Sequence, residues 1–190
     1  MLTEFYPAGM PVPEEKRTGR LYLRPLRATD VELDYEAVMS SAEMLRRWSQ
    51  SDWPADDFTL AENLADLQRH EGEHTERKAF TFTVLNPQGT QCLGCVYIQP
   101  LWPEDRPLCQ EAAYAADVGF WVRTSELTNA LDQHLFVTVR DWLQAEWAFD
   151  CILFTVGQQN TRQAALFEAA GLEQRLAYTS SDGRPWWVFG

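Results

Sequence analysis

The fold is decided by residues 114–172, YAADVGFWVRTSELTNALDQHLFVTVRDWLQAEWAFDCILFTVGQQNTRQAALFEAAGL. Two runs rich in β-branched and aromatic residues, 114–122 and 151–157, are each followed by an amphipathic segment, 127–147 and 159–172. This order predicts strand, helix, strand, helix. Proteins of the α/β class often bind a phosphate-bearing cofactor where a strand leads into a long helix. The turn between the first strand and helix, RTSELTN, contains no glycine, so it departs from the usual phosphate-binding turn.

The flanking sequence adds further strands and helices. Alternating or β-branched runs predict strands at 21–26, 80–85, 92–98, 173–178 and 185–189. Asp30 is placed to cap one helix. Thr59 and Glu62 form a capping box for another helix, which should fade near Gly72. The stretch 99–111 contains three prolines and is predicted to be a long loop, where functional residues often lie.

The length and composition predict one domain with a proper core. The chain has 190 residues, of which 45% are hydrophobic. Residues 1–20 carry three prolines and two glycines, and they are expected to form an irregular N-terminal arm before a domain at 21–190. The order of strands and helices favours the α/β class, with helices on both faces of a mixed, mostly antiparallel sheet.

The net charge and the cysteine content restrict the cellular compartment and the classes of partner to be expected. A formal net charge of −12 repels phosphate backbones, so we expect no nucleic-acid partner; it favours a cationic substrate instead. No apolar run approaches the ~20 residues needed to cross a bilayer, and the N-terminus lacks the order of a secretion signal. Four cysteines are too sparse for a disulfide framework. We therefore expect a reduced, cytoplasmic protein without a membrane partner.

Three segments carry a family resemblance: LYLRPLRATD at 21–30, ADVGFWV at 116–122, and NTRQAALFEAAGL at 160–172. Together they resemble the GNAT superfamily of N-acetyltransferases, closest to the branch that acetylates the N-terminal amines of ribosomal proteins. The resemblance implies acetyl-coenzyme A (acetyl-CoA) as co-substrate and transfer of its acetyl group to a primary amine, either a protein N-terminus or a small cationic amine. The alternative is a GNAT-fold protein that has lost cofactor binding and acts as a ligand- or protein-binding module. A homodimer is compatible with either.

The resemblance also assigns cofactor contacts. It implies that pantetheine runs beside the strand at 116–122 and that the pyrophosphate rests on backbone N–H groups at the start of the next helix. The implied cofactor-binding residues are Phe120, Trp121, Val122, Arg123, Thr128, Asn129, Ala130 and Asn160. Asn160 is in addition a helix cap by residue type and position.

The phosphate-binding turn departs from the family pattern. The family supplies a Gln or Arg and two small residues, where this chain has Leu127, Ala130 and Asp132. Asp132 places a negative charge in the first helical turn. Either it only stabilises its own helix, and no anion binds there, or it points aside and Arg123 or Arg162 supplies the missing positive charge.

The expected acid–base groups are incomplete. Asp117 lies in the strand where relatives often carry a Glu, so it either faces the cleft as the catalytic base or faces solvent. The family's Tyr acid falls on Phe167, which has no proton to give. Positioning of amine and thioester is itself a large effect. We expect Asp117→Asn to lower turnover, most visibly at low pH.

Three further motifs have competing interpretations. His70-Glu-Gly-Glu-His74 matches a zinc signature, but Gly72 and the polar flanks favour a solvated helix end, so no metal site is predicted. Cys92 and Cys95, three apart on a strand, should point to opposite faces and pack in the core; Cys151 should be a small core residue, and Cys109 more exposed. Loop tryptophans are candidates for the acceptor pocket wall, for ordinary packing or for an interface. They are Trp48, Trp53 and Trp102.

Overall fold

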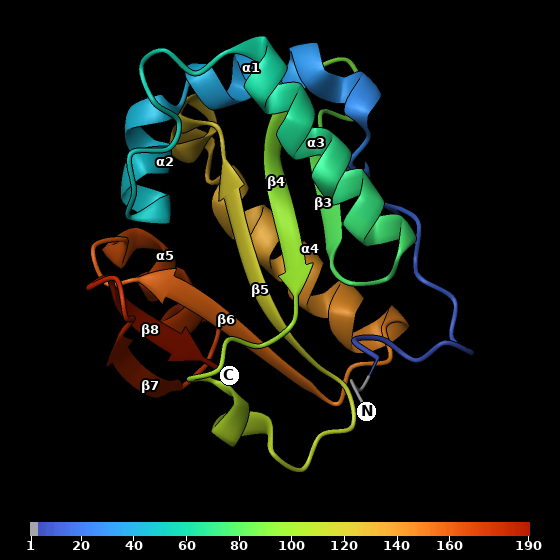
Figure 1. Cartoon of the computed structure of the whole chain (residues 1–190), viewed down its shortest axis with the longest axis vertical. Coiled ribbons are helices and arrows are strands. Elements are labelled where there is room, and N and C mark those ends of the chain that lie inside the picture. Colours follow the sequence, from blue (N-terminus) through green and yellow to red (C-terminus); the bar gives the residue numbers. More distant parts are fainter. Residues whose placement is uncertain (1–3) are drawn as a thin grey trace.

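The structure is a computed structural model that describes residues 4–190. In these residues eight strands form one sheet in the order β1-β2-β3-β4-β5-β6-β8-β7 (Figure 1). The strands are β1 (Lys16–Arg17), β2 (Tyr22–Pro25), β3 (Phe80–Leu85), β4 (Cys92–Gln99), β5 (Ala115–Val122), β6 (Cys151–Gly157), β7 (Gln174–Thr179) and β8 (Pro185–Phe189). Neighbouring strands are antiparallel except β5 and β6, which are parallel. The predicted α/β fold with a mixed, mostly antiparallel sheet is confirmed.

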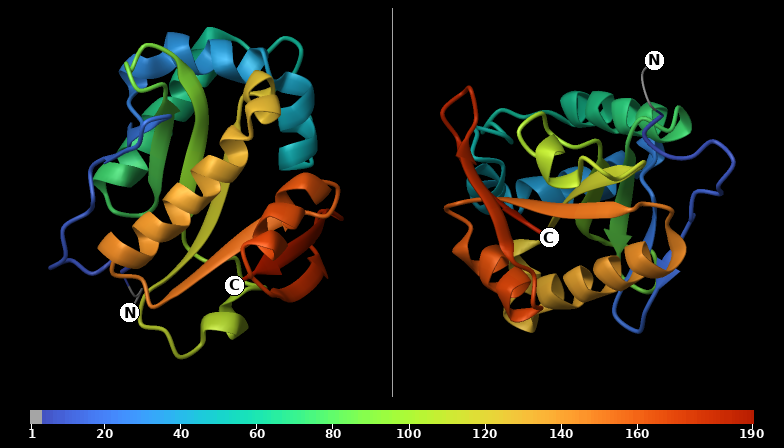
Figure 2. Two further views of the ribbon diagram at one scale, coloured as in Figure 1. Left: turned by 180° about the vertical axis from the view of Figure 1, so that it is seen from behind. Right: turned by 90° about the horizontal axis from the view of Figure 1, so that it is seen from below.

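Helices cover both faces of the sheet (Figures 1 and 2). The α-helices are α1 (Val31–Met39), α2 (Ala42–Ser49), α3 (Leu60–Thr75), α4 (Leu131–Glu146) and α5 (Thr161–Ala169); three 3₁₀ segments are η1 (Ala28–Asp30), η2 (Arg106–Cys109) and η3 (Thr124–Asn129). Helices α1, α2 and α3 pack on one face, around Leu45, Leu67 and Trp121. Helices α4 and α5 pack on the other, where Phe82, Phe120 and Trp142 belong to an aromatic core. We found no helix in the described residues with the length and apolar character of a membrane span.

The N-terminal arm is irregular but docked on the domain. Tyr6 is 1% exposed and packs edge-on against Phe80 and Trp147. Further along, β1 pairs with β2. The arm therefore closes one end of the aromatic core, and the part of it at residues 1–3 lies outside the described residues.

Helix-end predictions had mixed outcomes. The capping box of Thr59 and Glu62 is confirmed, because each side chain accepts from the other's backbone N–H. Asp30 does occupy the N-cap position of α1, but its carboxylate instead bonds Arg24 and the N–H of Arg27. The expected end near Gly72 was wrong, since α3 continues to Thr75. Packing of the last turn on the sheet outweighs the ~1 kcal/mol cost of a helical glycine.

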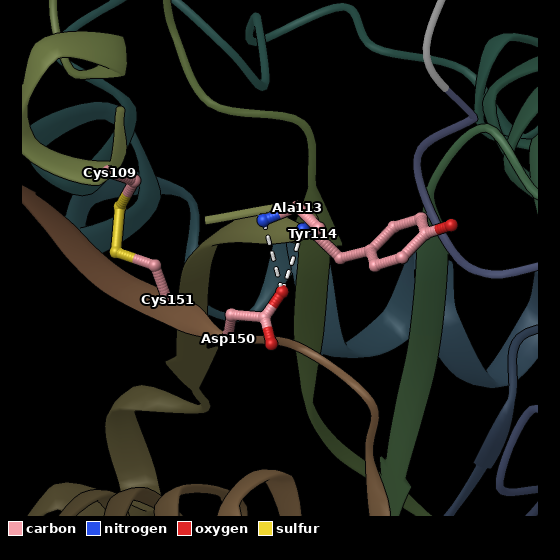
Figure 3. The surroundings of a disulfide bond; sticks show 5 residues. All are labelled: Cys109, Ala113, Tyr114, Asp150 and Cys151. Atoms are coloured by element: carbon pink, nitrogen blue, oxygen red, sulfur yellow. Dashed lines mark hydrogen bonds between the residues drawn. A yellow bond between two sulfur atoms is a disulfide. The ribbon is translucent and has the colours of Figure 1, made fainter. Parts of the chain in front are cut away.

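The expectation that all four cysteines are reduced was also wrong. Cys109 in η2 forms a disulfide with Cys151 at the start of β6, and Cys109 is buried rather than exposed (Figure 3). Sequence spacing of 42 residues gave no indication of this contact. Cys92 and Cys95 are free and buried, as expected, but they share one face of the sheet, with helices α1 to α3. A register shift between β3 and β4 beside Cys92 breaks the simple alternation.

Candidate active site

The site begins where two parallel strands separate. The register between β5 and β6 runs from Ala115 opposite Cys151 to Asp117 opposite Leu153. Beyond these residues the strands diverge, with α5 and the start of α4 at the open end (Figures 1 and 2). The Phe120 carbonyl points into the gap, where Nε2 of Gln163 donates to it at 2.9 Å. Because backbone polar groups of a strand repeat every second residue, those of Val122 face the same gap.

A first cavity of about 230 Å³ lies at the open end of this gap. Its walls come from β5, from the following turn and from the start of α5, and they include Phe120, Trp121, Val122, Leu127 and Asn160. Asn160 caps α5 by accepting from the N–H of Gln163, which confirms the predicted cap. The cavity therefore combines an apolar strand edge with a helix N-terminus, an arrangement suited to a long ligand ending in an anion.

The turn from β5 to α4 replaces glycine by a strained alanine. It consists of η3 and then Ala130, which has a left-handed backbone with φ 52° and ψ 39°. Side chains other than glycine seldom adopt this conformation, at a cost of about 1 kcal/mol. Two arginines brace the turn: Arg20 donates to the Asn129 carbonyl at 2.7 Å, and Arg162 donates to the Leu127 carbonyl at 2.8 Å. Arg20 adds a positive charge to this turn, whereas the charge of Arg162 is balanced by Asp132.

Ala130→Gly tests the conformation of this turn. We expect the variant to be neutral or up to about 1 kcal/mol more stable than the wild type, because relief of the left-handed strain offsets the greater freedom of glycine in the unfolded chain. The matched control is Ala65→Gly on the exposed face of α3, which should lose about 1 kcal/mol. Urea unfolding measures both variants. Equal destabilisation of the two would contradict a left-handed Ala130.

The negative charge of Asp132 is matched by Arg162. Asp132 is 5% exposed, and its two carboxylate oxygens accept from Arg162, at 2.6 Å from Nε and 3.0 Å from Nη2. This two-point contact turns the Asp132 carboxylate toward α5 and leaves a neutral pair beside the helix N-terminus. Of the two arginines proposed from sequence, Arg162 lies at the turn. Arg123 does not: its buried side chain donates to Glu36 on α1 at 2.6 Å and to Ser40 at 3.0 Å.

A second, larger cavity of about 780 Å³ adjoins the first, and Trp48 lines both. Its size is that of an ordinary small-ligand site. Six aromatic side chains line it: Trp48, Trp53, Tyr97, Trp102, Tyr178 and Trp186. The three tryptophans singled out from sequence thus all lie on this wall. Aromatic faces attract cations as well as apolar groups, so the lining suits an amine carried on an apolar body.

Asp117 lies on the wall of this second cavity, at the last paired position between β5 and β6. It is 2% exposed, so it faces the cavity and not bulk solvent. Its Oδ2 accepts from Gln99 Nε2 at 3.1 Å and from Trp102 Nε1 at 3.2 Å, while its Oδ1 is buried without a hydrogen-bond partner. Burial raises the pKa of Asp117, which the hydrogen bonds from neighbouring side chains only partly offset. Such a carboxyl group is suited to accepting a proton.

Comparison with known proteins agrees with this geometry. The model of the acetyltransferase (GNAT) domain matches residues 20–173. The chain belongs to this family. A search of curated protein sequences gives no match. As a GNAT member the protein is an acetyl-CoA-dependent N-acetyltransferase, and the predicted family and cofactor are confirmed.

Solved structures of GNAT enzymes share the fold at low identity. A RimL ribosomal L7/L12 α-N-protein acetyltransferase in complex with coenzyme A is 14% identical, with a TM-score of 0.71 over 93% of this chain and 96% of that one. A ribosomal-protein-S5-alanine acetyltransferase from Vibrio fischeri is 15% identical, with a TM-score of 0.68 over 93% of this chain and 95% of that one. RimJ from Mycobacterium smegmatis in complex with a CoA-disulfide is 17% identical, with a TM-score of 0.70 over 89% of this chain and 80% of that one.

The structure places the predicted GNAT site residues in three groups. Four of the eight implied cofactor residues line the first cavity: Phe120, Trp121, Val122 and Asn160. Three others, Thr128, Asn129 and Ala130, lie in the turn beside it, with the first two exposed. Arg123 follows β5 but directs its side chain to α1. Phe167, at the position of the family's Tyr acid, is 1% exposed in the aromatic core.

The zinc-like motif has a packing role in this GNAT domain. His74 packs edge-on against Phe80 and Phe82, and His70 packs on Tyr97 with Nδ1 3.1 Å from the Thr81 hydroxyl. Glu71 accepts from the N–H of Ala28. The motif forms the C-terminal turns of α3, as expected, but its residues are half-buried against the sheet rather than fully solvated. Within residues 4–190 no group of three or more His, Cys, Asp or Glu is arranged to hold a metal ion.

Sequence reasoning missed three residues of the site. Arg20 was assigned to the arm, yet it reaches the turn before α4. Gln163 bonds the open edge of β5 from α5. Asp105, in the loop between β4 and β5, is 0% exposed, and burial together with the nearby charge of Asp117 raises its pKa. Only the late helix signature around Asn160 could have pointed to Gln163; the other two depend on tertiary contacts.

Proposed function

We propose that this GNAT enzyme acetylates a primary amine, on a protein N-terminus or a small cationic molecule, with its two substrates in the two adjoining cavities. Acetyl-CoA would occupy the first cavity, with pantetheine along Phe120–Val122 and the pyrophosphate at the N-terminus of α4. The acceptor would occupy the larger cavity. The observation that carries this proposal is that Trp48 lines both cavities, so that acceptor and thioester meet where β5 and β6 separate.

The chemistry is direct transfer. The bound ammonium ion gives a proton to Asp117, and the free amine attacks the acetyl carbonyl carbon. A nitrogen–carbon bond forms, the carbon–sulfur bond breaks, the attacking nitrogen releases its second proton to solvent, and CoA leaves as its thiolate. Phe167 cannot protonate that thiolate, so the proton comes from solvent. Holding amine and thioester together supplies a large part of the rate, and proton removal adds to it.

The charges at the turn favour this function over a binding module that has lost its cofactor. The main support for that alternative was the uncompensated charge of Asp132. The contact with Arg162 removes this support, because the pair is neutral and Arg20 adds a positive charge nearby. The Asp117 carboxylate and the aromatic lining of the larger cavity support a cationic amine as the acceptor. The names of the ribosomal-protein acetyltransferases among its structural neighbours add a protein N-terminus as one candidate.

Release of the CoA thiol tests the proposal. Acetyl-CoA is incubated with peptides that begin with a free Ser or Ala, and with benzylamine as a small aromatic amine. We expect release above spontaneous hydrolysis with at least one of these acceptors, and none with the same peptides blocked by N-acetylation. Release that does not depend on a free amine, while CoA binding is measured directly, would contradict the proposal.

A further inference from the structure

Asp105 is a buried carboxyl group that the protein leaves without partners. It is 0% exposed, and neither Oδ1 nor Oδ2 has a hydrogen-bond partner. Other buried carboxyl groups are compensated, as Asp30 is by Arg24 and Asp34 by Asn63. Within residues 4–190, Asp105 is the one buried carboxyl group with both oxygens unpaired. Burying an ionised carboxylate in this way costs several kcal/mol, so the group either holds a proton or waits for a cation.

The loop that carries Asp105 is held in place. Its backbone N–H donates to the Trp102 carbonyl, and its carbonyl accepts from Leu108. Four residues later Cys109 is joined to Cys151, and the carboxylate of Asp150 accepts from the N–H groups of Ala113 and Tyr114 (Figure 3). The loop is therefore fastened to the start of β6 at two places, and Asp105 cannot readily turn out into solvent.

Asp105 lies close enough to Asp117 for the charges of the two carboxyl groups to interact. The charged and titratable groups that act on it are Asp117 on β5 and Glu104 in its own loop, while Asp105 in turn raises the pKa of Tyr178 on β7. The hydroxyl of Thr155 on β6 lies close enough to lower the pKa of both aspartates, but its geometry makes a full hydrogen bond to neither. Burial and, after it, the charge of Asp117 raise the pKa of Asp105 to about 7.

No basic side chain lining the cavity, among the described residues, is free to neutralise these carboxyl groups. Arg69 pairs with Asp66 and Glu73. Arg184 pairs with Asp182 and bonds the Ser49 carbonyl. Burial lowers the pKa of His70, so its ring is mostly neutral near pH 7. The oxygens left with unused acceptor capacity, on Asp105, Asp117 and Thr155, are thus arranged for a positive charge that the protein does not supply.

We propose that Asp105 and Asp117 form one carboxyl pair that binds the acceptor as its ammonium ion and takes up the proton that the ammonium releases. Asp117 contacts the acceptor, and Asp105 acts through Asp117 as a positioning and proton-holding residue. With one proton on the pair its charge is −1, and transfer from the ammonium leaves both carboxyl groups neutral. The proton returns to solvent after the amide has formed. This assignment rests on the proposed function and specifies the acceptor as a primary ammonium ion.

The first test uses the pH profile of Asp105→Asn, with benzylamine as acceptor. Removing one of two like charges lowers the pKa of Asp117, so the acid limb of kcat/KM should move about 0.5–1 pH unit toward lower pH. Above about pH 7, where both carboxyl groups of the wild type are ionised, KM for benzylamine should rise about fivefold in the variant, because the site then carries one negative charge instead of two. The control is Asp150→Asn, which loosens the same loop without touching the pair. An acid limb that stays in place in Asp105→Asn, or moves equally in Asp150→Asn, would overturn the proposal.

The second test measures thermal stability and does not depend on acetyltransferase activity. The pKa of Asp105 is about 7 in the folded protein and about 3.9 in the unfolded chain. Its contribution to the free energy of unfolding is therefore fully present below about pH 4 and is lost as the pH rises to about 7. Asp105→Asn lacks this loss. Relative to the wild type, its Tm should therefore rise by about 7–14 °C between pH 4.5 and pH 7.5. A Tm difference between variant and wild type that does not change with pH would overturn the carboxyl pair. If the difference grows with pH as expected but no acetyl transfer is detected, only the proposed function is contradicted.

Discussion

Asp117→Asn is expected to lower kcat by about 10²–10³-fold while leaving CoA affinity within about threefold of the wild type. The variant keeps the shape of the side chain and loses the proposed proton acceptor, and general-base catalysis is typically worth 10²–10⁴-fold. Asp117 lines the larger cavity and not the first, so the cofactor contacts are unaffected. Steady-state kinetics with benzylamine, together with calorimetric titration of CoA, separate the two effects.

The pH dependence of this deficit follows from burial. Because the pKa of Asp117 is raised, the wild type loses its own base as the pH falls, and its rate approaches that of the variant. The deficit should therefore be largest near neutral pH, above the pKa of Asp117 and below that of the amine. The sequence alone suggested the largest deficit at low pH, and the buried environment of Asp117 reverses that expectation. Asp141→Asn, which makes the same charge change on the exposed surface of α4, is the control. A kcat within threefold of the wild type would remove Asp117 from the mechanism.

Arg162→Met should weaken CoA binding by about 10–30-fold. Without the guanidinium, the buried Asp132 carboxylate faces the pyrophosphate as an uncompensated like charge. Arg162 is 52% exposed, so solvent screens part of this effect, and about 1.4–2 kcal/mol is a reasonable loss. Asp132→Asn should act in the opposite direction and tighten CoA binding several-fold, because it leaves Arg162 free to face the phosphates. Calorimetric titration measures both.

The opposite signs of these two variants make the prediction specific. A role of the pair in folding alone would make both variants bind CoA more weakly, since each breaks the same contact. Arg47→Met is the matched control: Arg47 lines the same cavity, but its exposed side chain pairs with Glu43 and does not touch the turn. CoA affinity lowered equally by Arg162→Met and Asp132→Asn would contradict the charge argument.

Local sequence patterns predicted the structural features that are determined by residues close together in the chain. The hairpin at 80–98, the capping box of Thr59 and Glu62 and the Asn160 cap are each set within a few residues, and the structure has all of them. Asp117 was placed correctly on its strand, but two orientations remained open until the separation of β5 and β6 put it in the cavity wall.

Contacts between distant segments could not be predicted in the same way. Asp132 and Arg162 are 30 residues apart, and only the packing of α5 beside the start of α4 shows that they form a pair. The Cys109–Cys151 disulfide and the burial of Asp105 depend on how the loop between β4 and β5 folds back, for which its composition gives no pattern. Helix α3 passes Gly72 because its last turn packs on Phe80 and Phe82, an interaction across the sheet that outweighs local propensity.

The central claim is that the turn between β5 and α4 holds a pyrophosphate although it lacks glycine and carries Asp132. Calorimetric titration of the wild-type protein with CoA and with pantetheine tests it most directly, because the two share the arm proposed to lie along β5 and only CoA has phosphates. We expect CoA to bind with a Kd of about 1–100 μM and pantetheine at least tenfold more weakly. No heat with CoA, or equal affinity for the two ligands, would contradict the claim.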